Sequence, residues 1–119
     1  MVVIDDDDEI RVLIAALLSD RYDVSCASDG AAGLALIRER RPELVVLDLL
    51  MPRMHGFEVC QRVRADPALK DVKVLISSSK SYNHDMRTAV EETGADGYIV
   101  KPFKVDEFNR RVDEILAPA

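Results

Sequence analysis

The chain has 119 residues, of which 48% are hydrophobic and 32% are charged, and its formal net charge is −6. This length and balance predict one globular domain over residues 1–119 with a sizeable core. The acidic charge, without a basic stripe, predicts that the domain does not bind nucleic acid directly. The apolar runs are far too short to cross a bilayer and no signal peptide is recognisable, so we expect a cytoplasmic protein without a membrane partner.

The first part of the chain alternates between short apolar runs and amphipathic stretches. Residues 2–4 are predicted to form a buried strand that ends at Asp5. Residues 10–18 carry apolar side chains at helical spacing. Residues 24–26 alternate with polar neighbours, as in a half-exposed edge strand. Asp29 is placed to cap the next helix, which ends before a proline.

The second part repeats this alternation. Residues 44–47 are four branched aliphatic side chains, which predict a strand buried on both faces and ending at Asp48. Cys26 and Cys60 have no pairing motif and are predicted to be reduced core thiols. The other predicted elements are a helix around 57–63, a strand at 74–76, a helix around 86–90, a strand at 98–100 and a helix over 105–116. Five strands alternating with five helices predict an α/β fold with a parallel sheet covered on both faces.

Polar side chains stand at the ends of four predicted strands. Asp5 and Asp6 follow the first strand, Asp48 the third, Ser77–Ser79 the fourth and Lys101 the fifth. Parallel strands present their carboxyl ends at one edge of the sheet, where ligands collect in open α/β folds, so these groups can converge. Neighbouring carboxylates repel one another unless a cation intervenes, and Mg²⁺ suits such oxygen ligands. A lysine and a hydroxyl suit a phosphoryl group that acquires charge.

At these residues the chain resembles the receiver domain of two-component response regulators, in the manner of a chemotaxis-regulator-like single domain. The matching segments span almost the whole chain: Val3–Asp6, Leu47-Asp48, Met51-Pro52 with Gly56, Ser78, and Tyr98–Phe103. The resemblance implies a doubly wound, flavodoxin-like sheet with five strands in the order 2-1-3-4-5 and five helices.

The resemblance also implies a role for the acids. Asp48 would accept a phosphoryl group from the phosphohistidine of a sensor histidine kinase or of a histidine phosphotransfer protein. Asp6 and Asp48 would bind Mg²⁺ directly, together with the backbone carbonyl of Leu50. Asp5 would act mainly through water.

The remaining implied roles concern the fourth and fifth strands. Ser78 would donate its hydroxyl to one phosphoryl oxygen and Lys101 would pair with another. The peptide bond before Pro102 is expected to be cis. Tyr98 would turn inward when Ser78 moves, and the face built by the last two helices and the fifth strand would change its preference for a downstream target or output domain. The resemblance leaves open a phosphorylation-dependent dimer.

Each assignment has a structural alternative. Asp7-Asp8 are interpreted only as acids at a helix start, where the helix dipole favours them. Ser77 or Ser79 would be the hydroxyl donor if the strand register differed by one residue. Tyr98 could be a fixed, half-buried strand aromatic. His55 replaces the acid or amide that many receivers have there, so we expect a weaker cap on the following helix.

The leading hypothesis is a phosphoacceptor signalling domain that catalyses only its own phosphorylation and dephosphorylation and is therefore not an enzyme in the usual sense. One alternative is a Mg²⁺-dependent phosphatase of the haloacid dehalogenase type, which normally has a second aspartate where this chain has Leu50. A flavodoxin-like cofactor binder is another, although a phosphate-binding loop after the first strand is absent. The third is a receiver-like interaction module that is not phosphorylated.

Overall fold

Strands and helices alternate through residues 1–79, as the sequence predicts, and a further strand and helix follow within residues 94–117. The computed structural model describes residues 1–49, 54–79 and 94–117. Within these ranges the strands are β1 (Val2–Ile4), β2 (Ser25–Ala27), β3 (Leu44–Asp48), β4 (Lys73–Ser79) and β5 (Gly97–Lys101). The helices are α1 (Asp8–Ser19), α2 (Gly30–Arg40), α3 (Gly56–Ala65), a short 3-10 helix (Pro67–Leu69) and α5 (Val105–Leu116). The helix predicted around residues 86–90 lies outside the described residues.

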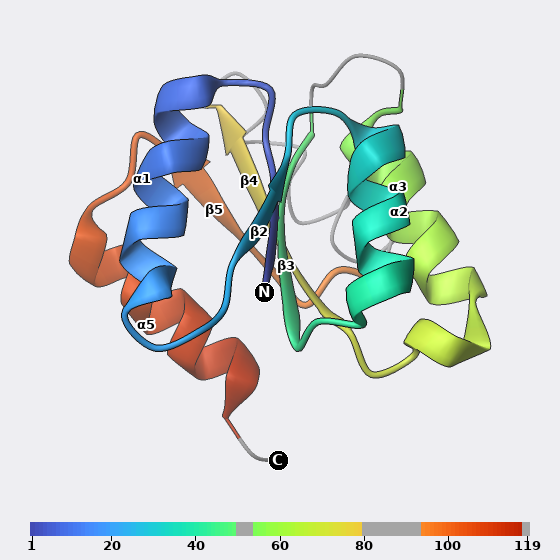
Figure 1. Ribbon diagram of the computed structural model, residues 1–119. Coiled ribbons are helices and arrows are strands. Elements are labelled where there is room, and N and C mark those ends of the chain that lie inside the picture. The colour runs from blue at the N-terminus through green and yellow to red at the C-terminus, as the bar shows by residue number, and fades with distance from the viewer. Residues whose placement is uncertain (50–53, 80–93, 118–119) are drawn as a thin grey trace.

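The five strands form one parallel sheet in the order β2-β1-β3-β4-β5. Figure 1 shows α1 and α5 on one face of this sheet and α2 and α3 on the other. The predicted doubly wound, flavodoxin-like α/β fold is therefore confirmed, with four α-helices in the described part of the chain. Because helices cover both faces, every residue of β3 is buried, in agreement with its unbroken apolar run.

Each face of the sheet has its own hydrophobic cluster. The cluster toward α2 and α3 takes these strand residues: Val2, Ile4, Val45, Leu47, Val74 and Ile76. The cluster toward α1 and α5 takes the alternate ones: Val3, Leu44, Val46, Leu75 and Ile99. Successive side chains of a strand point to opposite faces. Asp5, Asp48 and Lys101 therefore continue the series that faces α1 and α5.

Two of the α-helices begin at an aspartate that caps them. Asp7 accepts hydrogen bonds from two backbone N–H groups in the first turn of α1. Asp29 accepts one from the backbone N–H of Ala32 in α2, at 2.8 Å, which confirms the predicted cap. His55 makes no side-chain hydrogen bond to α3, as expected of a weaker cap. No helix in the described ranges is long and apolar enough to cross a bilayer.

The strand β2 lies at the edge of the sheet. Cys26 in its centre is exposed, whereas Cys60 of α3 is buried. The prediction of two core thiols is therefore wrong for Cys26, because one face of an edge strand can remain uncovered by a helix.

Arg64, near the end of α3, ties that helix to the starts of two strands. Its Nε donates a hydrogen bond to the carbonyl of Gly94 and its Nη1 donates one to the carbonyl of Val72, both at 2.7 Å. Its Nη2 pairs with Asp96 at 2.6 Å, and Asp96 also accepts a hydrogen bond from the backbone N–H of Val74. These bonds fix the amino ends of β4 and β5, at the edge of the sheet opposite the polar strand ends.

Candidate functional site

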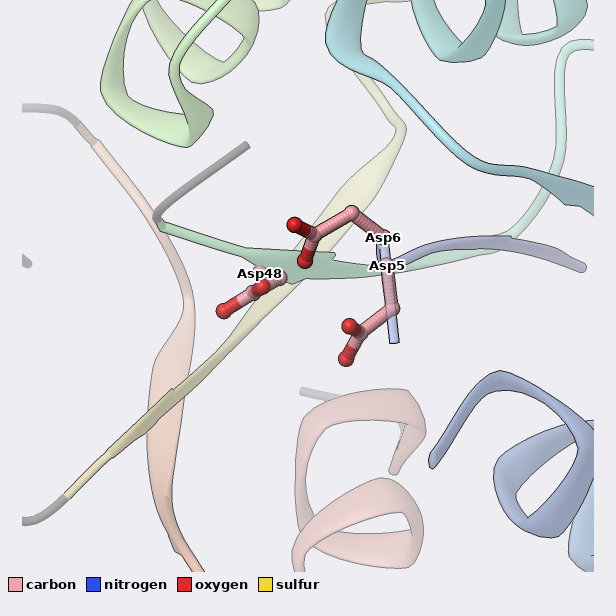
Figure 2. A group of neighbouring side chains, drawn as sticks. All are labelled: Asp5, Asp6 and Asp48. Atoms are coloured by element: carbon pink, nitrogen blue, oxygen red, sulfur yellow. The ribbon is translucent and has the colours of Figure 1, made fainter. Parts of the chain in front are cut away.

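Three carboxylates meet at the carboxyl ends of β1 and β3 (Figure 2). Asp5 and Asp6 directly follow β1, and Asp48 is the last residue of β3. One oxygen from each carboxylate lies within 4.8 Å of the others. Asp5 is 1% exposed and Asp48 is 7% exposed, whereas Asp6 is exposed to solvent. The sequence thus predicted correctly that these three acids converge, and they are the residues that could hold a hard cation.

Lys101, the last residue of β5, reaches two of these acids. Its Nζ donates hydrogen bonds to Oδ2 of Asp5 at 3.2 Å and to Oδ1 of Asp48 at 3.3 Å. Because β4 lies between β5 and β3, the side chain of Lys101 crosses β4 to make these contacts. One ammonium cannot balance three carboxylates, so the cluster keeps an excess of negative charge.

Burial and this excess of negative charge shift the pKa values of two groups in the cluster. Burial and then repulsion from Asp5 raise the pKa of Asp48 to about 7, although Lys101 opposes the rise. Burial lowers the pKa of Lys101, but attraction and hydrogen bonds from Asp48 and Asp5 together outweigh burial and raise it. Near neutral pH the metal-free site therefore holds a firmly charged lysine beside an Asp48 that is only partly ionised.

Two neighbours hold Asp5 in place, one through its side chain and one through its backbone carbonyl. The backbone N–H of Asp7 donates a hydrogen bond to Oδ1 of Asp5 at 2.9 Å. Arg11 of α1 donates from its Nη1 to the backbone carbonyl of Asp5, also at 2.9 Å. Arg11 was not singled out from the sequence, because nothing in a helical spacing shows that its side chain turns back over the end of β1.

The contact of Arg11 with Asp5 predicts that Arg11 contributes more to the free energy of unfolding than the surface residue Arg21. Replacing Arg11 with methionine is expected to lower the free energy of unfolding by about 1–2 kcal/mol, because the part-buried carbonyl of Asp5 loses its partner. Arg21 pairs with Asp113 at the surface, and Arg21→Met should cost less than about 0.5 kcal/mol. Urea unfolding of both variants measures this, and equal losses would contradict the bracing role of Arg11.

Two glycines, each the first residue of a helix, allow close backbone contacts. A Cβ at Gly56 would lie 2.2 Å from the carbonyl oxygen of Asp48, and one at Gly30 would lie 2.1 Å from that of Met54. Both contacts are with backbone atoms, which cannot rotate away. Gly56 was noted in the sequence as part of a family motif, and the structure supplies the steric reason for a glycine at this position.

The serines that end β4 differ in their surroundings. Ser77 lies beside Asp48 in the strand register, and Ser78 lies one residue further, beside Val100. Alternation along the strand places Ser77 on the face of Asp48 and Lys101 and Ser78 on the opposite face. Both serines are buried. The Oγ of Ser77 has no hydrogen-bond partner among the described residues.

The other predicted site residues are placed as follows. Tyr98 is half-buried on β5, and the guanidinium carbon of Arg111 in α5 lies 5.8 Å from the centre of its ring. The peptide bond between Lys101 and Pro102 is cis. The carbonyl of Leu50 lies outside the described residues.

Residues 1–113 match the family model of the response regulator receiver domain. The chain belongs to this family. The receiver is 39% identical to the DNA-binding dual master transcriptional regulator RpaA of Synechocystis sp., over 98% of this chain and 48% of that protein. It is 36% identical to the DNA-binding response regulator MtrA of Mycolicibacterium smegmatis, over 94% of this chain and 48% of that protein. The receiver spans about half the length of the curated relatives that it matches.

Solved structures agree with this assignment. The receiver domain of NtrX from Brucella abortus has a TM-score of 0.89 at 29% identity and covers 99% of this chain and 98% of that chain. The chemotaxis response regulator CheY4 of Vibrio cholerae has a TM-score of 0.88 at 28% identity, covering 97% and 96%. The resemblance inferred from the sequence is therefore confirmed.

One expectation about partners is wrong. The acidic charge of the chain predicted that nucleic acid is not a partner, yet the names of RpaA and MtrA describe DNA-binding regulators. A net charge of −6 describes only the residues counted, and these correspond to about half of each such regulator. The net charge of a receiver domain therefore does not show whether a regulator that contains the domain binds DNA.

Proposed function

We propose that this receiver accepts a phosphoryl group on Asp48 from the phosphohistidine of a sensor histidine kinase or a histidine phosphotransfer protein. The observation that carries the proposal is the grouping of one nearly buried carboxylate with two others within 4.8 Å and an ammonium at 3.3 Å. The family to which the chain belongs is a signalling family. That membership favours a phosphoacceptor over a phosphatase of the haloacid dehalogenase type.

The transfer that we propose exchanges one bond for another. A carboxylate oxygen of Asp48 attacks phosphorus, the bond between phosphorus and the donor's imidazole nitrogen breaks, and the imidazole leaves with that electron pair. The product is an acyl phosphate, and no redox partner is needed. The attacking oxygen must be unprotonated, and the pKa of about 7 in the metal-free site works against this near neutral pH.

The donor set of the cluster fits Mg²⁺, because its ligands are carboxylate oxygens grouped at a solvent-accessible edge. Both oxygens of Asp5 already accept hydrogen bonds, one from the backbone of Asp7 and one from Lys101, which supports a contact of Asp5 through water. Asp6 and Asp48 would be the direct carboxylate ligands, with the carbonyl of Leu50. Bound Mg²⁺ would supply the positive charge that the acids and the incoming phosphoryl group lack.

Lys101 would move part of its hydrogen bonding from Asp48 to a phosphoryl oxygen. Ser78 leaves β4 on the opposite face, so its hydroxyl would reach another phosphoryl oxygen around the carboxyl end of the strand. A cation–π contact supports a link between β5 and α5, because the guanidinium of Arg111 in α5 lies over the ring of Tyr98 in β5. A change at the end of β5 would thereby reach the surface of α5, where we propose that a downstream target or output domain binds. The names of the curated relatives favour a DNA-binding output.

Labelling with acetyl phosphate and Mg²⁺ tests the proposal directly. We expect a mass gain of one phosphoryl group in the wild-type receiver, and loss of that gain in Asp48→Asn and in EDTA. Asp71→Asn, a change at an exposed acid remote from the cluster, serves as the matched control and should be labelled like the wild type. Equal labelling of Asp48→Asn would show that another residue is the acceptor. Absence of labelling in the wild type would favour an interaction module instead.

A further inference from the structure

The hydroxyl of Ser77 is a buried polar group that the proposed chemistry has not used. Ser77 is 0% exposed, and its Oγ has no hydrogen-bond partner among the described residues. Burying a hydroxyl without a partner costs free energy, and an aliphatic side chain would fill the same place in the strand without that cost. A hydroxyl here is therefore best explained by a partner that is present in another state of the site.

The strand register places this hydroxyl inside the acid and lysine cluster. Ser77 lies directly beside Asp48 of β3 on one side and beside Ile99 of β5 on the other. Neighbouring strands are about 4.8 Å apart, and residues paired in register point to the same face. Asp48, Ser77 and Ile99 thus form one row across the face that α1 and α5 cover.

The side chain of Lys101 passes over this row. Lys101 is paired with Ser79, two residues beyond Ser77 on the same strand. From there its Nζ reaches back to Asp48 and Asp5 on the far side of β4. The lysine must therefore cross β4 on the face to which Ser77 belongs.

The hydrogen-bonding capacities of the two groups match. An ammonium has three N–H donors, and the described contacts of Lys101 use two of them. A serine hydroxyl can accept a hydrogen bond. A cation and a phosphoryl group would occupy the oxygens of Asp48, and the ammonium would then lose the contact that draws it toward β3.

We propose that Ser77 is a positioning residue for Lys101. When Asp48 carries a phosphoryl group, the buried hydroxyl of Ser77 accepts a hydrogen bond from the ammonium and holds that ammonium over β4, facing the phosphoryl group. This role rests on the proposed function, and it is distinct from that of Ser78, which would contact the phosphoryl group itself. Ser77 acts only through the lysine.

Threonine and valine provide the matched pair of variants, because they have nearly the same shape and differ by the hydroxyl. We expect Ser77→Thr to be labelled by acetyl phosphate and Mg²⁺ within about twofold of the wild-type rate. Ser77→Val should be labelled about tenfold more slowly, as expected for the loss of a hydrogen bond to a charged group. Ser77→Ala adds no atoms to the buried site and should be slowed like the valine variant, so it decides the case if the larger side chains do not fold.

A second background separates a positioning role from a structural one. In Lys101→Met the valine and threonine variants should be labelled at the same rate, because the hydroxyl has lost the group through which it acts. A slow valine variant in both backgrounds would overturn the proposal, as would equal rates of the two variants beside Lys101. If Lys101→Met is too slow to measure, a crystal structure of the wild type with Mg²⁺ and beryllium fluoride decides. An Oγ–Nζ distance within about 3.2 Å supports the proposal and a longer one overturns it.

Failure of this inference can be distinguished from failure of the proposed function. If the wild type gains no phosphoryl group, the proposed function fails, and with it the premise of the inference. If the wild type and Ser77→Thr are labelled and Ser77→Val is labelled equally fast, only the role of Ser77 fails.

Discussion

Replacing Asp48 with asparagine is expected to raise the stability of the metal-free receiver at pH 8 by roughly 3 kcal/mol. Burial and repulsion from Asp5 raise the pKa of Asp48 from 3.8 to about 7. At about 1.36 kcal/mol per pKa unit, the ionised carboxylate costs the folded state on the order of 4 kcal/mol. The pKa of about 7 already includes the hydrogen bond of Lys101. An asparagine amide replaces the protonated carboxyl imperfectly in a buried site, which reduces the gain by about 1 kcal/mol.

The contribution of Asp48 to folding stability depends on pH, and its direction follows from the raised pKa. A carboxyl whose pKa is raised in the folded state favours folding while it is protonated in both states. That contribution is complete below a pH of about 4 and is lost as the pH rises toward about 7. The advantage of Asp48→Asn over the wild type should therefore be small at pH 4, grow between pH 4 and 7, and stay constant above.

Urea unfolding in EDTA at pH 5 and pH 8, followed by far-UV circular dichroism, measures this difference. Asp71→Asn serves as a control at an exposed acid and should show no such trend. Adding Mg²⁺ should stabilise the wild type and reduce the advantage of the variant, because a bound cation favours the charged cluster. An Asp48→Asn variant that is less stable than the wild type in EDTA at pH 8 would contradict the account of the acid cluster.

The second large effect is expected at Gly56, the first residue of α3. An alanine there would place its Cβ 2.2 Å from the carbonyl oxygen of Asp48 and 2.9 Å from the Cα of Leu49. Both atoms belong to the backbone at the carboxyl end of β3, so either α3 or β3 must shift. We expect Gly56→Ala to lower the free energy of unfolding by about 3 kcal/mol or more, against the usual helical preference for alanine.

Gly97 provides the matched control for this substitution. A Cβ at Gly97 would lie 3.2 Å from Cδ1 of Ile115, the end of a side chain that can adjust. Gly97→Ala should therefore cost less than about 1 kcal/mol. Urea unfolding of the two alanine variants makes the comparison, and labelling with acetyl phosphate reports whether Asp48 has been displaced. If both variants lost a similar free energy of unfolding, the backbone at Asp48 would have to shift at a lower cost than the close contact of Gly56 indicates.

Much of the fold and three of the acids could be predicted because they depend on short-range patterns. The unbroken run 44–47 predicts a strand buried on both faces, and a charged residue directly after such a strand lies at the edge of the sheet. The same reasoning brings Asp5, Asp48 and Lys101 to one edge. Alternating strands and helices then leave few topologies for a sheet covered on both sides.

The rest depends on contacts between segments far apart in the sequence. The close approach of Gly56 to Asp48 requires the angle at which α3 meets β3, which a hydrophobic pattern does not contain. Arg11 turns back over Asp5 only because α1 begins near the end of β1. For the serines, the sequence left the register open by one residue, and pairing with β3 and β5 is what assigns Ser77 to the face of Lys101.

The two hydrogen bonds of Lys101 also determine when the site can form as the chain is synthesised. They join residues that are 96 and 53 positions apart in the chain, so they connect the first strand and the third strand with the last. During synthesis from the amino terminus, Asp48 emerges from the ribosome well before the lysine that completes its surroundings. A chain that is truncated before β5 would contain Asp48, the proposed phosphoacceptor, and still lack Lys101, so the proposed phosphorylation would require nearly the whole receiver to have folded.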